Sequence, residues 1–498
     1  MAVASVHLMR NRIVVKGYVS EKCPGWLPNH LRVFDSKTKR YDKDKTYSYQ
    51  LPNGDIIFPR TTETRHIVQK LNSQGYEVEG IYDETNDDVI EFRNFKDRIE
   101  LKDHIRPKSQ FQVEGIDFLT KGLHTNVHYR LLSLPTGDGK TFCALAAMCI
   151  YGRKTLIVAN QLSSQWVGEI FDKTTANYKR IYEIKDGIDS LEKLMKPNVH
   201  PESYDIFVAS LKTLINAVPS GMYLKFCEKF GIGLKIVDEI HLATYSNVYL
   251  DMMAPIQETL YLSATPARSN PAEDWCLHKA FANLPQYGQE VKAFKTKYLN
   301  TIYVFYDTHP KYYEIKECQN WYGFQTKKFA THILSKPQNR DMIRDILRWA
   351  IETTLPAIGE DEKIVIILEL KEHIKSMQGW LANEFPGVKV GDYSSNVDKN
   401  IKQNMLRSKI ILTTENSFGT GADLNNTLRV LINTTSFNSK VTAEQLPGRL
   451  RNIPGRKVYY IDLVDKGFKR SYEHYLNRSK IINGYSLTVQ KRTYGVDI

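Results

Sequence analysis

The sequence has few cysteines, and they are not arranged as a framework. Six cysteines are scattered along 498 residues, and no two of them form a CxxC pair. A disulfide-stapled scaffold is therefore excluded, and a reducing compartment is expected. The histidines do not show the spacing of metal ligands either, so no histidine-ligated metal centre is expected. This absence of ligand spacing holds for His7, His104, His124 and His128.

Long hydrophobic runs are also missing. The most apolar stretch, Phe142 to Ile150, is far shorter than the roughly 20 residues that a membrane-spanning helix needs. The apolar start of the chain is interrupted by His7 and Arg10, which makes it a poor signal peptide. We therefore expect a soluble protein of the cytoplasm and do not expect a membrane enzyme. There is no repeat at a fixed period and no low-complexity segment.

The composition is that of an ordinary globular protein. Hydrophobic residues make up 42% and charged residues 25%, which excludes disorder of the whole chain. At about 150 residues per domain, the length predicts roughly three domains. Lysine and arginine exceed the acidic residues and give a net charge of +12. This excess favours an anionic partner, but it does not distinguish nucleic acid, a membrane surface or an acidic protein.

The pattern of apolar runs divides the chain into four segments. Residues 1–104 carry short alternating runs, turn signals and one helical stretch, which predict a small α+β domain that could bind DNA. From residue 105, apolar runs alternate with helical stretches, as in parallel α/β sheets. Two such series predict tandem α/β lobes at 105–290 and 291–465, followed by a short, basic, helical extension at 466–498. The expected strands are 130–134, 155–159, 205–209, 234–237, 259–263, 301–306, 363–368, 388–393, 409–414, 430–434 and 458–463.

A glycine-rich segment, Leu134 to Thr141 (LPTGDGKT), follows the first of these strands and opens a helical stretch. Glycines in that context let successive backbone N–H groups point at a phosphate, and the helix N-terminus adds positive potential. Lys140 would reach the β- and γ-phosphates, and the Thr141 hydroxyl would bind Mg²⁺. Leu134 occupies a position where the strict pattern has glycine. The alternative is an ordinary turn between a strand and a helix.

Two adjacent carboxylates, Asp238 and Glu239, end another apolar strand about a hundred residues later. Such a pair is costly unless something uses it. Asp238 could hold Mg²⁺ while Glu239 positions or deprotonates the attacking water. A solvated strand end is the alternative, but the preceding phosphate-binding loop favours the functional interpretation.

Four ordered motifs then identify a family resemblance. The segments PTGDGKT, DEIH, SATP and QLPGR occur in the order found in superfamily 2 helicases of the DExH type, over about residues 105–465. The motif spacing and the small N-terminal domain are most similar to the phage UvsW-like recombination and branch-migration helicases. The resemblance implies two tandem RecA-like lobes that use ATP and Mg²⁺. Weaker matches are Phe111-Gln112, Gln165-Trp166, 210–213, 364–368, 413–414 and 421–423.

The resemblance implies a role for each matching residue. The nucleotide-binding residues would be Gln112, Pro135, Thr136, Gly137, Asp138, Gly139, Lys140, Thr141, Gly421 and Asp423. Catalysis would use Lys140, Asp238, Glu239, Gln445, Arg449 and Arg451. Coupling of hydrolysis to lobe movement would use Ser263, Ala264 and Thr265. Nucleic acid would be contacted by Gln165, Ser210, Lys212, Thr413, Lys469, Arg470, Tyr472 and Tyr475.

The sequence departs from the family at its last motif. The usual second arginine, three residues beyond Arg449, is Asn452, and Arg451 lies one position early. Either Arg451 acts as the arginine finger through a shifted turn, or Arg449 acts alone.

Basic and aromatic residues alternate near the C-terminus. Residues 466–498 contain seven Lys/Arg against two acidic residues, with Phe468 and several tyrosines between them. Cations for phosphates and rings for bases are typical of a nucleic-acid surface. Alternatively, the rings pack a helix on the second lobe. Another aromatic cluster, between 298 and 329, consists of strand core, of a loop that stacks bases, or of both.

These features predict an ATP-dependent helicase or translocase that remodels branched DNA, acting as a monomer on forks, junctions or RNA–DNA hybrids. Two alternatives within the enzymes are a double-strand DNA translocase and an RNA helicase. A further alternative, from another class, is a nucleic-acid annealing or scaffold protein with a weak ATPase.

Overall fold

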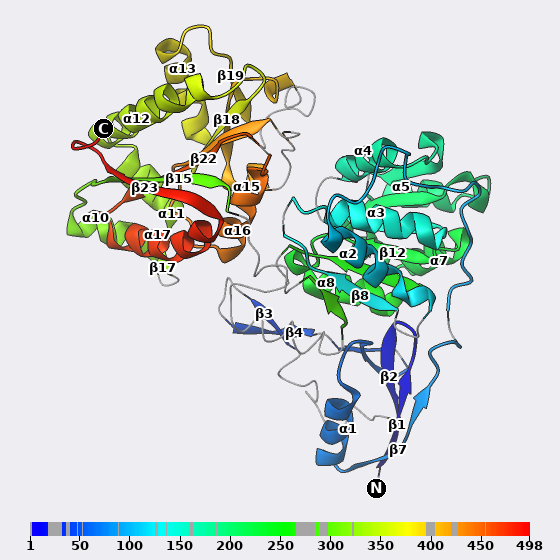
Figure 1. Cartoon of the computed structure of the whole chain (residues 1–498). Helices are drawn as coiled ribbons and strands as arrows, with labels where there is room; N and C mark the ends of the chain where they lie inside the picture. Colours follow the sequence, from blue (N-terminus) through cyan, green and yellow to red (C-terminus); the bar gives the residue numbers. More distant parts are fainter. Residues whose placement is uncertain are drawn as a thin grey trace. The chain divides into compact units, whose positions relative to one another are not determined.

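The computed structural model divides the chain into two compact units, Met1–Ala293 and Phe294–Ile498 (Figure 1). Each unit is described by itself. The residues that the structure describes are 2–17, 32–35, 40–46, 48–51, 53–87, 89–124, 128–135, 137–159, 163–185, 187–264, 284–288, 297–320, 323–394, 404–419, 424, 427–453 and 455–498.

The first residues form a five-stranded sheet with the order β5-β6-β2-β1-β7. All of its neighbouring strands are antiparallel except β1 and β7, which run parallel. Helix α1 (Thr64–Ser73) buries Ile67 and Leu71. The strands are β1 (Ala2–Leu8), β2 (Arg12–Lys16), β5 (Tyr49–Gln50), β6 (Ile56–Pro59) and β7 (Tyr76–Asp83), and a separate antiparallel pair is formed by β3 (Arg32–Asp35) and β4 (Arg40–Thr46).

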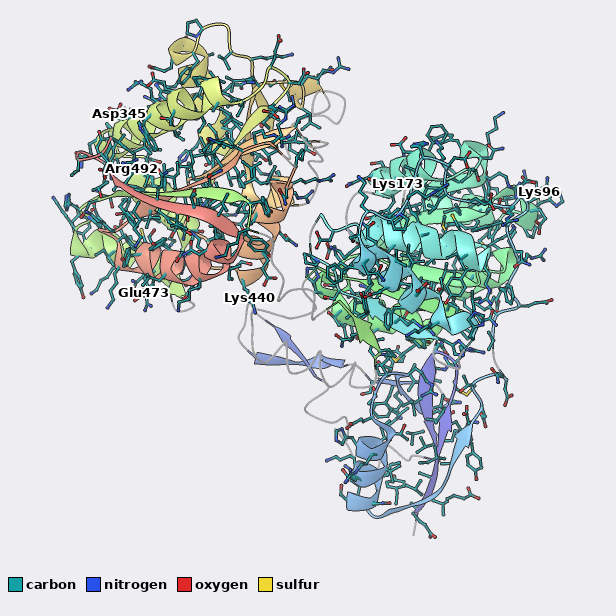
Figure 2. All side chains as sticks on the ribbon, viewed as in Figure 1. Lys96, Lys173, Asp345, Lys440, Glu473 and Arg492 are labelled. Carbon is teal, nitrogen blue, oxygen red and sulfur yellow. The ribbon has the colours of Figure 1, made fainter. Side chains whose placement is uncertain are left out.

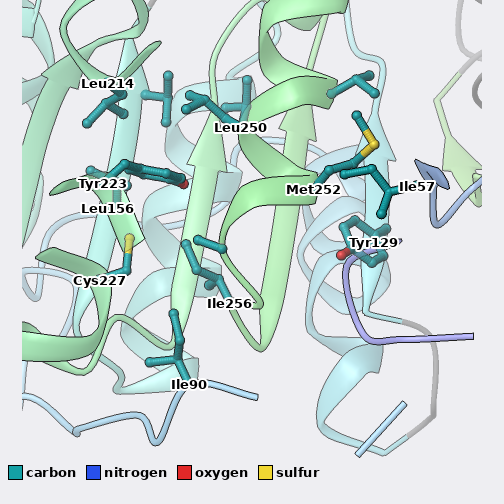
Figure 3. Packing of buried hydrophobic residues seen from close by; sticks show 14 of the residues in the cluster. Ile57, Ile90, Tyr129, Leu156, Leu214, Tyr223, Cys227, Leu250, Met252 and Ile256 are labelled. Atoms are coloured by element: carbon teal, nitrogen blue, oxygen red, sulfur yellow. The ribbon is translucent and has the colours of Figure 1, made fainter. Parts of the chain in front are cut away.

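This N-terminal sheet shares a hydrophobic core with the parallel sheet that follows it. Figure 3 shows Ile57 of β6 beside Met252 and Tyr129, which come from later in the chain. The Tyr129 hydroxyl donates to the carbonyl of Arg10 at 2.9 Å. The continuous core means that β1, β2, β6, β7 and α1 pack against the first lobe.

The first lobe is a seven-stranded, all-parallel sheet with the order β10-β11-β9-β12-β13-β8-β14. Its central strands are buried on both sides, which explains their continuous apolar runs. Helices α2, α3 and α4 cover one face, and α5 to α8 cover the other. The strands are β8 (Tyr129–Leu132), β9 (Thr155–Ala159), β10 (Ile181–Ile184), β11 (Ile206–Ser210), β12 (Leu234–Val237), β13 (Glu258–Leu262) and β14 (Gln286–Tyr287). The helices are α2 (Gln110–Thr120), α3 (Lys140–Tyr151), α4 (Ser163–Lys173), α5 (Ile188–Met195), α6 (Leu211–Ala217), α7 (Met222–Phe230) and α8 (Thr244–Met253).

The second unit contains another seven-stranded parallel sheet, with the order β19-β20-β18-β21-β22-β15-β23. Helices α12 and α13 cover one face, and α15, α16 and α17 cover the other. The strands are β15 (Leu299–Tyr306), β18 (Lys363–Leu368), β19 (Val390–Tyr393), β20 (Ile410–Thr414), β21 (Leu428–Asn433), β22 (Val458–Asp465) and β23 (Ser486–Thr493). The helices are α10 (Tyr312–Glu317), α11 (Thr326–Phe329), α12 (Pro337–Thr354), α13 (Lys371–Glu384), α15 (Glu415–Gly419), α16 (Lys440–Arg449) and α17 (Lys469–Ile482), and a small hairpin pairs β16 (Gln319–Asn320) with β17 (Gly323–Phe324).

The prediction of two parallel-sheet α/β lobes with a small N-terminal domain is therefore confirmed. Each of the eleven strands expected in the lobes coincides with an observed strand. The sequence patterns missed β10, β14 and β23, which all lie at sheet edges. Edge strands are partly solvated, so they lack a continuous apolar run.

The C-terminal segment differs from the expected helical extension in one respect. Helix α17 is present, but the chain then continues into β23, which pairs with β15 along its length. The last residues therefore complete the second sheet. Among the described residues, no helix is both long enough and apolar enough to cross a membrane.

Candidate active site

The glycine-rich segment forms a tight turn between β8 and α3. Gly137 and Gly139 have φ values of 93° and 88°, a region that side-chain-bearing residues rarely adopt. A Cβ atom on Gly139 would also lie 2.5 Å from Nε2 of Gln112, so glycine is required there for space as well. Leu134, the departure from the strict motif, is fully buried in the core beneath the turn. Thr136 lies outside the described residues.

Lys140 and Gln112 support this turn from inside. Lys140 is largely buried, and its Nζ donates to the carbonyl of Leu134 at 3.1 Å. Gln112, from α2, donates through Nε2 to the carbonyl of Asp138 at 3.0 Å and accepts through Oε1 from the Lys108 N–H at 2.7 Å. Gln112 therefore braces the turn with the carboxamide that the family resemblance assigns to adenine recognition.

The remaining residues of the turn occupy positions open to a ligand. The side chain of Asp138 is exposed. In a turn that binds phosphate through its backbone N–H groups, this side chain is not needed for binding. Pro135 and Thr141 are half-buried, and Thr141 lies in the first turn of α3. Backbone N–H groups at such a helix start, together with Lys140, are suited to phosphate.

Asp238 lies at the carboxyl end of β12 and is held by both its backbone and its side chain. Its N–H donates to the carbonyl of Val158 at 3.0 Å. Its Oδ2 accepts a hydrogen bond from Nε1 of Trp166 at 3.0 Å. Burial, and then repulsion by Glu239, raises the pKa of Asp238 to about 6, while Trp166 and Lys140 oppose the rise. A half-buried carboxylate with an acidic neighbour gains from a divalent cation, so these residues fit Mg²⁺.

Glu239 has an unusual backbone and joins two motifs. Its φ of 48° is one of two positive values among the described non-glycine residues, and it aims the residue out of the strand. Its Oε2 lies 3.4 Å from the Ala264 N–H and 3.3 Å from Nδ1 of His241. The same Nδ1 lies 2.8 Å from Oγ of Ser263, which is fully buried. The DEIH and SAT segments therefore meet directly; Thr265 lies outside the described residues.

Three predicted nucleic-acid contacts lie at or next to the first turns of helices that follow strands of the same sheet. Gln165 is exposed in the first turn of α4, and Lys212 is exposed in the first turn of α6. The Ser210 side chain caps α6 by accepting from the Thr213 N–H at 3.2 Å. Because all strands of this sheet are parallel, these helix starts share its carboxyl edge with the glycine-rich turn and Asp238.

In the second unit, Gln445 and Arg449 lie on α16, one turn apart and therefore on the same face. Both are half-buried. Arg451 lies beyond the end of α16 and is exposed. Gly421 and Asp423 lie outside the described residues.

Two predicted nucleic-acid contacts are buried in the second unit. Thr413 is fully buried, and its hydroxyl donates to the carbonyl of Tyr393 at 2.8 Å. Tyr475 is 5% exposed, with its ring centroid 5.0 Å from Tyr303 and 5.3 Å from Phe305. Thr413 is therefore held inside the second unit by Tyr393, and Tyr475 packs on the sheet through the apolar face of α17. Contact of these two residues with nucleic acid stays a prediction.

The other predicted contacts on α17 remain accessible. Lys469 and Arg470 are exposed, and Arg470 pairs with Glu473, whose side chain lies on α17 in Figure 2. Tyr472 is 37% exposed, although its ring also approaches Phe305. The helix therefore packs Tyr475 inward and presents Lys469 and Arg470 to solvent. Packing on the second lobe is present, and contact of the exposed charges with nucleic acid stays a prediction.

The second aromatic cluster also divides into core and surface. Tyr303 and Tyr306 are buried strand residues. By contrast, Tyr312 and Tyr313 at the start of α10 are 72% and 57% exposed. Phe324 of the hairpin packs on Phe468, the residue before α17, with centroids 4.9 Å apart. Trp321 and Tyr322 lie outside the described residues.

Two residues at the centre of this geometry received no role from the sequence. Trp166 was recognised only as part of a weak motif match, and His241 only as the last letter of DEIH. The structure brings Trp166 to Asp238 and His241 to both Glu239 and Ser263. In the sequence, the only indication of a role for Trp166 and His241 is that each belongs to a motif. Their contacts join segments up to 72 residues apart, so the sequence pattern does not show them.

Comparisons with known proteins agree with this geometry. Residues 105–268 match the family described as the type III restriction enzyme, res subunit. The chain is 24% identical over 210 residues to the ATP-dependent DNA helicase fml1 of Schizosaccharomyces pombe, a match that covers 39% of this chain and 24% of fml1. It is also 24% identical over 343 residues to the transcript termination protein A18 of rabbit fibroma virus, which covers 65% of this chain and 64% of that protein. The chain thus spans less than two thirds of either relative.

Solved structures show the same fold. Yeast (S. cerevisiae) Dbp5 bound to RNA and ADP BeF3 superposes with a TM-score of 0.51 at 14% identity, covering 77% of this chain and 90% of Dbp5. A single-residue variant of Dbp5 in the same bound state gives a TM-score of 0.52 at 15% identity, with the same coverage. At this identity the likeness concerns the fold, which is that of tandem RecA-like helicase lobes.

Proposed function

We propose that this chain is an ATP-dependent helicase or translocase that remodels branched DNA. The observation that carries the proposal is the gathering of Lys140, Asp238, Glu239 and Ser263 at one edge of a parallel sheet. Glu239 contacts the Ala264 N–H and His241, His241 contacts Ser263, and the charge of Lys140 acts on Asp238. Such convergence of a phosphate-binding turn and two strand-end carboxylates suits phosphoryl transfer to water.

Each residue of the first lobe has a role in this proposal. The turn 135–141 binds the phosphates of ATP, with Lys140 on the β- and γ-phosphates and Gln112 bracing the turn beside the base. Thr141 and Asp238 hold Mg²⁺, which neutralises charge on the phosphates when it is bound. Glu239 orients the attacking water and accepts its proton.

The second unit is proposed to supply the groups that act on the γ-phosphate. Gln445 and Arg449 share one face of α16, which favours Arg449 as the arginine finger over Arg451. Gly421 and Asp423 are proposed to contact the nucleotide. An arginine finger typically contributes about 10³–10⁵ in rate, so this choice has a large kinetic consequence.

Hydrolysis is proposed to reach the nucleic acid through the contact of the DEIH and SAT segments. Loss of the γ-phosphate changes what Glu239 must hold, and Glu239 already contacts the Ala264 N–H and His241. Ser263, Ala264 and Thr265 would pass this change to lobe movement. If the lobes bind and release the nucleic-acid strand in step with this movement, the protein moves along the strand.

The nucleic-acid grip is proposed to be mainly to phosphates and therefore independent of sequence. Exposed Gln165, Lys212, Lys469, Arg470 and Tyr472 support it. Residues 1–104 are proposed to add duplex contacts, and the enzyme is proposed to act as a monomer. Because one relative is named a DNA helicase and a structural neighbour is bound to RNA, a double-strand DNA translocase or an RNA helicase is the second candidate.

ATP hydrolysis with and without nucleic acid tests the proposal. Wild-type protein should hydrolyse ATP faster with forked DNA, and Lys140→Ala or Glu239→Gln should abolish hydrolysis. Lys179→Ala, which removes an exposed lysine elsewhere in the same lobe, should behave as wild type. Unchanged hydrolysis in both active-site variants would overturn the proposal.

Strand displacement on forks, Holliday junctions, RNA–DNA hybrids and plain duplex then distinguishes the substrates. Preference for forks and junctions supports branch remodelling. Preference for RNA, or translocation on duplex without displacement, supports the second candidate. Strand annealing that persists in Lys140→Ala, with no ATP-dependent displacement by the wild type, would instead identify an annealing protein.

A further inference from the structure

Trp166 connects the surface of the first lobe to its half-buried acidic pair, Asp238 and Glu239. Its side chain is 4% exposed and packs in the core cluster that contains Val167 and Ile170 of the same helix. Its indole Nε1 nevertheless donates 3.0 Å to Oδ2 of Asp238. The adjacent residue in the chain, Gln165, is exposed. Within one turn, α4 therefore has a solvent-facing amide and an indole that holds a carboxylate.

The indole N–H of Trp166 donates to a carboxylate rather than to a backbone carbonyl. A buried tryptophan needs an acceptor for its N–H, and a backbone carbonyl would satisfy it. Here the acceptor is instead the carboxylate that is best suited to Mg²⁺ in this lobe, whose charged form burial and Glu239 already disfavour. A hydrogen bond to a charged group is roughly twice as strong as one between neutral groups, and it fixes orientation as well as energy.

The main chain of Asp238 is fixed separately. The Asp238 N–H donates to the carbonyl of Val158 in the neighbouring strand β9. The rigid strand thus sets where Asp238 is, while the Trp166 indole on α4 and the Glu239 backbone both act on how its carboxylate is turned. A displacement of α4 relative to β12 would therefore change the orientation of the Asp238 carboxylate without moving the Asp238 main chain.

We propose that Trp166 is a positioning residue that couples nucleic-acid contact at the start of α4 to the orientation of the Asp238 carboxylate. This inference rests on the proposed function, because it assumes that Asp238 binds Mg²⁺ and that the α4 start contacts a strand. A strand bound beside Gln165 sets the position of α4, and the indole N–H transmits that position to Oδ2 of Asp238. Groups that orient metal ligands in this way typically change metal affinity or activity by about 10–100-fold when they are lost.

The test uses the full-length chain and two substitutions at one position. Trp166→Phe keeps an aromatic ring but removes the N–H donor. Replacement of Trp166 by its benzothiophene analogue keeps the shape of the bicyclic ring and exchanges only the N–H for sulfur, so loss of packing is excluded. Val167→Ala is the matched control, because it removes volume from the same helix and the same core cluster.

Two measurements are made on each protein. The first is binding of a fluorescent ADP analogue as Mg²⁺ is titrated, which does not depend on turnover. The second is the ratio of ATP hydrolysis with forked DNA to hydrolysis without it. For both Trp166 substitutions we expect the half-saturating Mg²⁺ concentration to rise about tenfold and the DNA stimulation to fall toward one. Nucleotide affinity without Mg²⁺ should stay at the wild-type level.

The outcomes separate this inference from the proposed function. Wild-type Mg²⁺ dependence and wild-type DNA stimulation in the benzothiophene protein would overturn the role of Trp166 and leave the proposed function standing. An equal shift in Val167→Ala would also overturn it, because packing alone would then explain the effect. Absence of nucleic-acid-stimulated hydrolysis in the wild type would instead refute the proposed function.

Discussion

Arg478 offers a stringent test of how the second unit is held together. It comes from α17, is 1% exposed, and binds Asp462 of β22 with two hydrogen bonds, Nε to Oδ2 at 2.8 Å and Nη2 to Oδ1 at 3.0 Å. Asp462 is fully buried and also accepts from Nδ2 of Asn433 at 2.8 Å. This pair therefore joins α17 to the two strands β21 and β22.

Arg478→Ala should destabilise the second unit strongly. The substitution leaves the Asp462 carboxylate buried without its cation, and breaking a buried pair in this way costs about 3–5 kcal/mol. For a unit of roughly 200 residues, each kcal/mol lowers the melting temperature by about 2–4 °C, so a fall of about 10 °C is expected. The double substitution Arg478→Met with Asp462→Leu removes both charges and should recover most of the loss.

Thermal unfolding is followed by fluorescence, since Trp349 and Trp380 report on α12 and α13 of the second unit. Arg470→Ala, on the exposed side of the same helix, is the control and should shift the melting temperature by less than about 2 °C, because exposed ion pairs contribute little. A shift that small for Arg478→Ala would refute the reasoning. So would a double variant no more stable than the single one.

Two further predictions concern pH and the exposed rings. Burial raises the pKa of Asp465 to about 6, above its unfolded value, so its stabilising contribution is complete below pH 4 and is lost as pH rises through 6, by about 3 kcal/mol. Asp465→Asn should therefore flatten the pH dependence of the unfolding free energy between about pH 4 and 6, and an unaltered slope would contradict this. Tyr312→Ala with Tyr313→Ala should weaken single-stranded DNA binding by about 1–3 kcal/mol per stacked base, measured by fluorescence anisotropy at constant salt. Hydrolysis without DNA should not change, Tyr178→Ala serves as the exposed-tyrosine control, and equal affinities in all three proteins would show that these rings do not stack on bases.

The elements of both lobes could be predicted because their strands are buried on both faces. A strand such as β9 or β12 has no polar alternation, so its apolar run is visible without any knowledge of its neighbours. The edge strands β10, β14 and β23 could not be recognised in this way, because solvation permits polar residues there. The assignment of β23 in particular depends on its pairing with β15, which starts nearly 190 residues earlier.

Some residues of the candidate site could also be predicted from the sequence, and others could not. Lys140, Asp238 and Glu239 carry their own local signals, a glycine-rich turn before a helix and carboxylates at the end of a strand. The burial of Thr413 in strand β20 and of Tyr475 on the basic, aromatic helix α17 could not be predicted from their positions in the sequence. In both cases burial depends on which other segments pack against the element.

The sequence by itself determined the α/β class, the phosphate-binding turn and the order of the motifs, because these depend on residues close together in the chain. Only the tertiary structure decided which motifs touch. Strand β9 lies between β11 and β12, so order in the sheet is not order in the sequence. That crossover brings Trp166 to Asp238, and the neighbouring strands β12 and β13 bring His241 to Ser263. These contacts depend on packing between distant segments, which no local pattern of residues encodes.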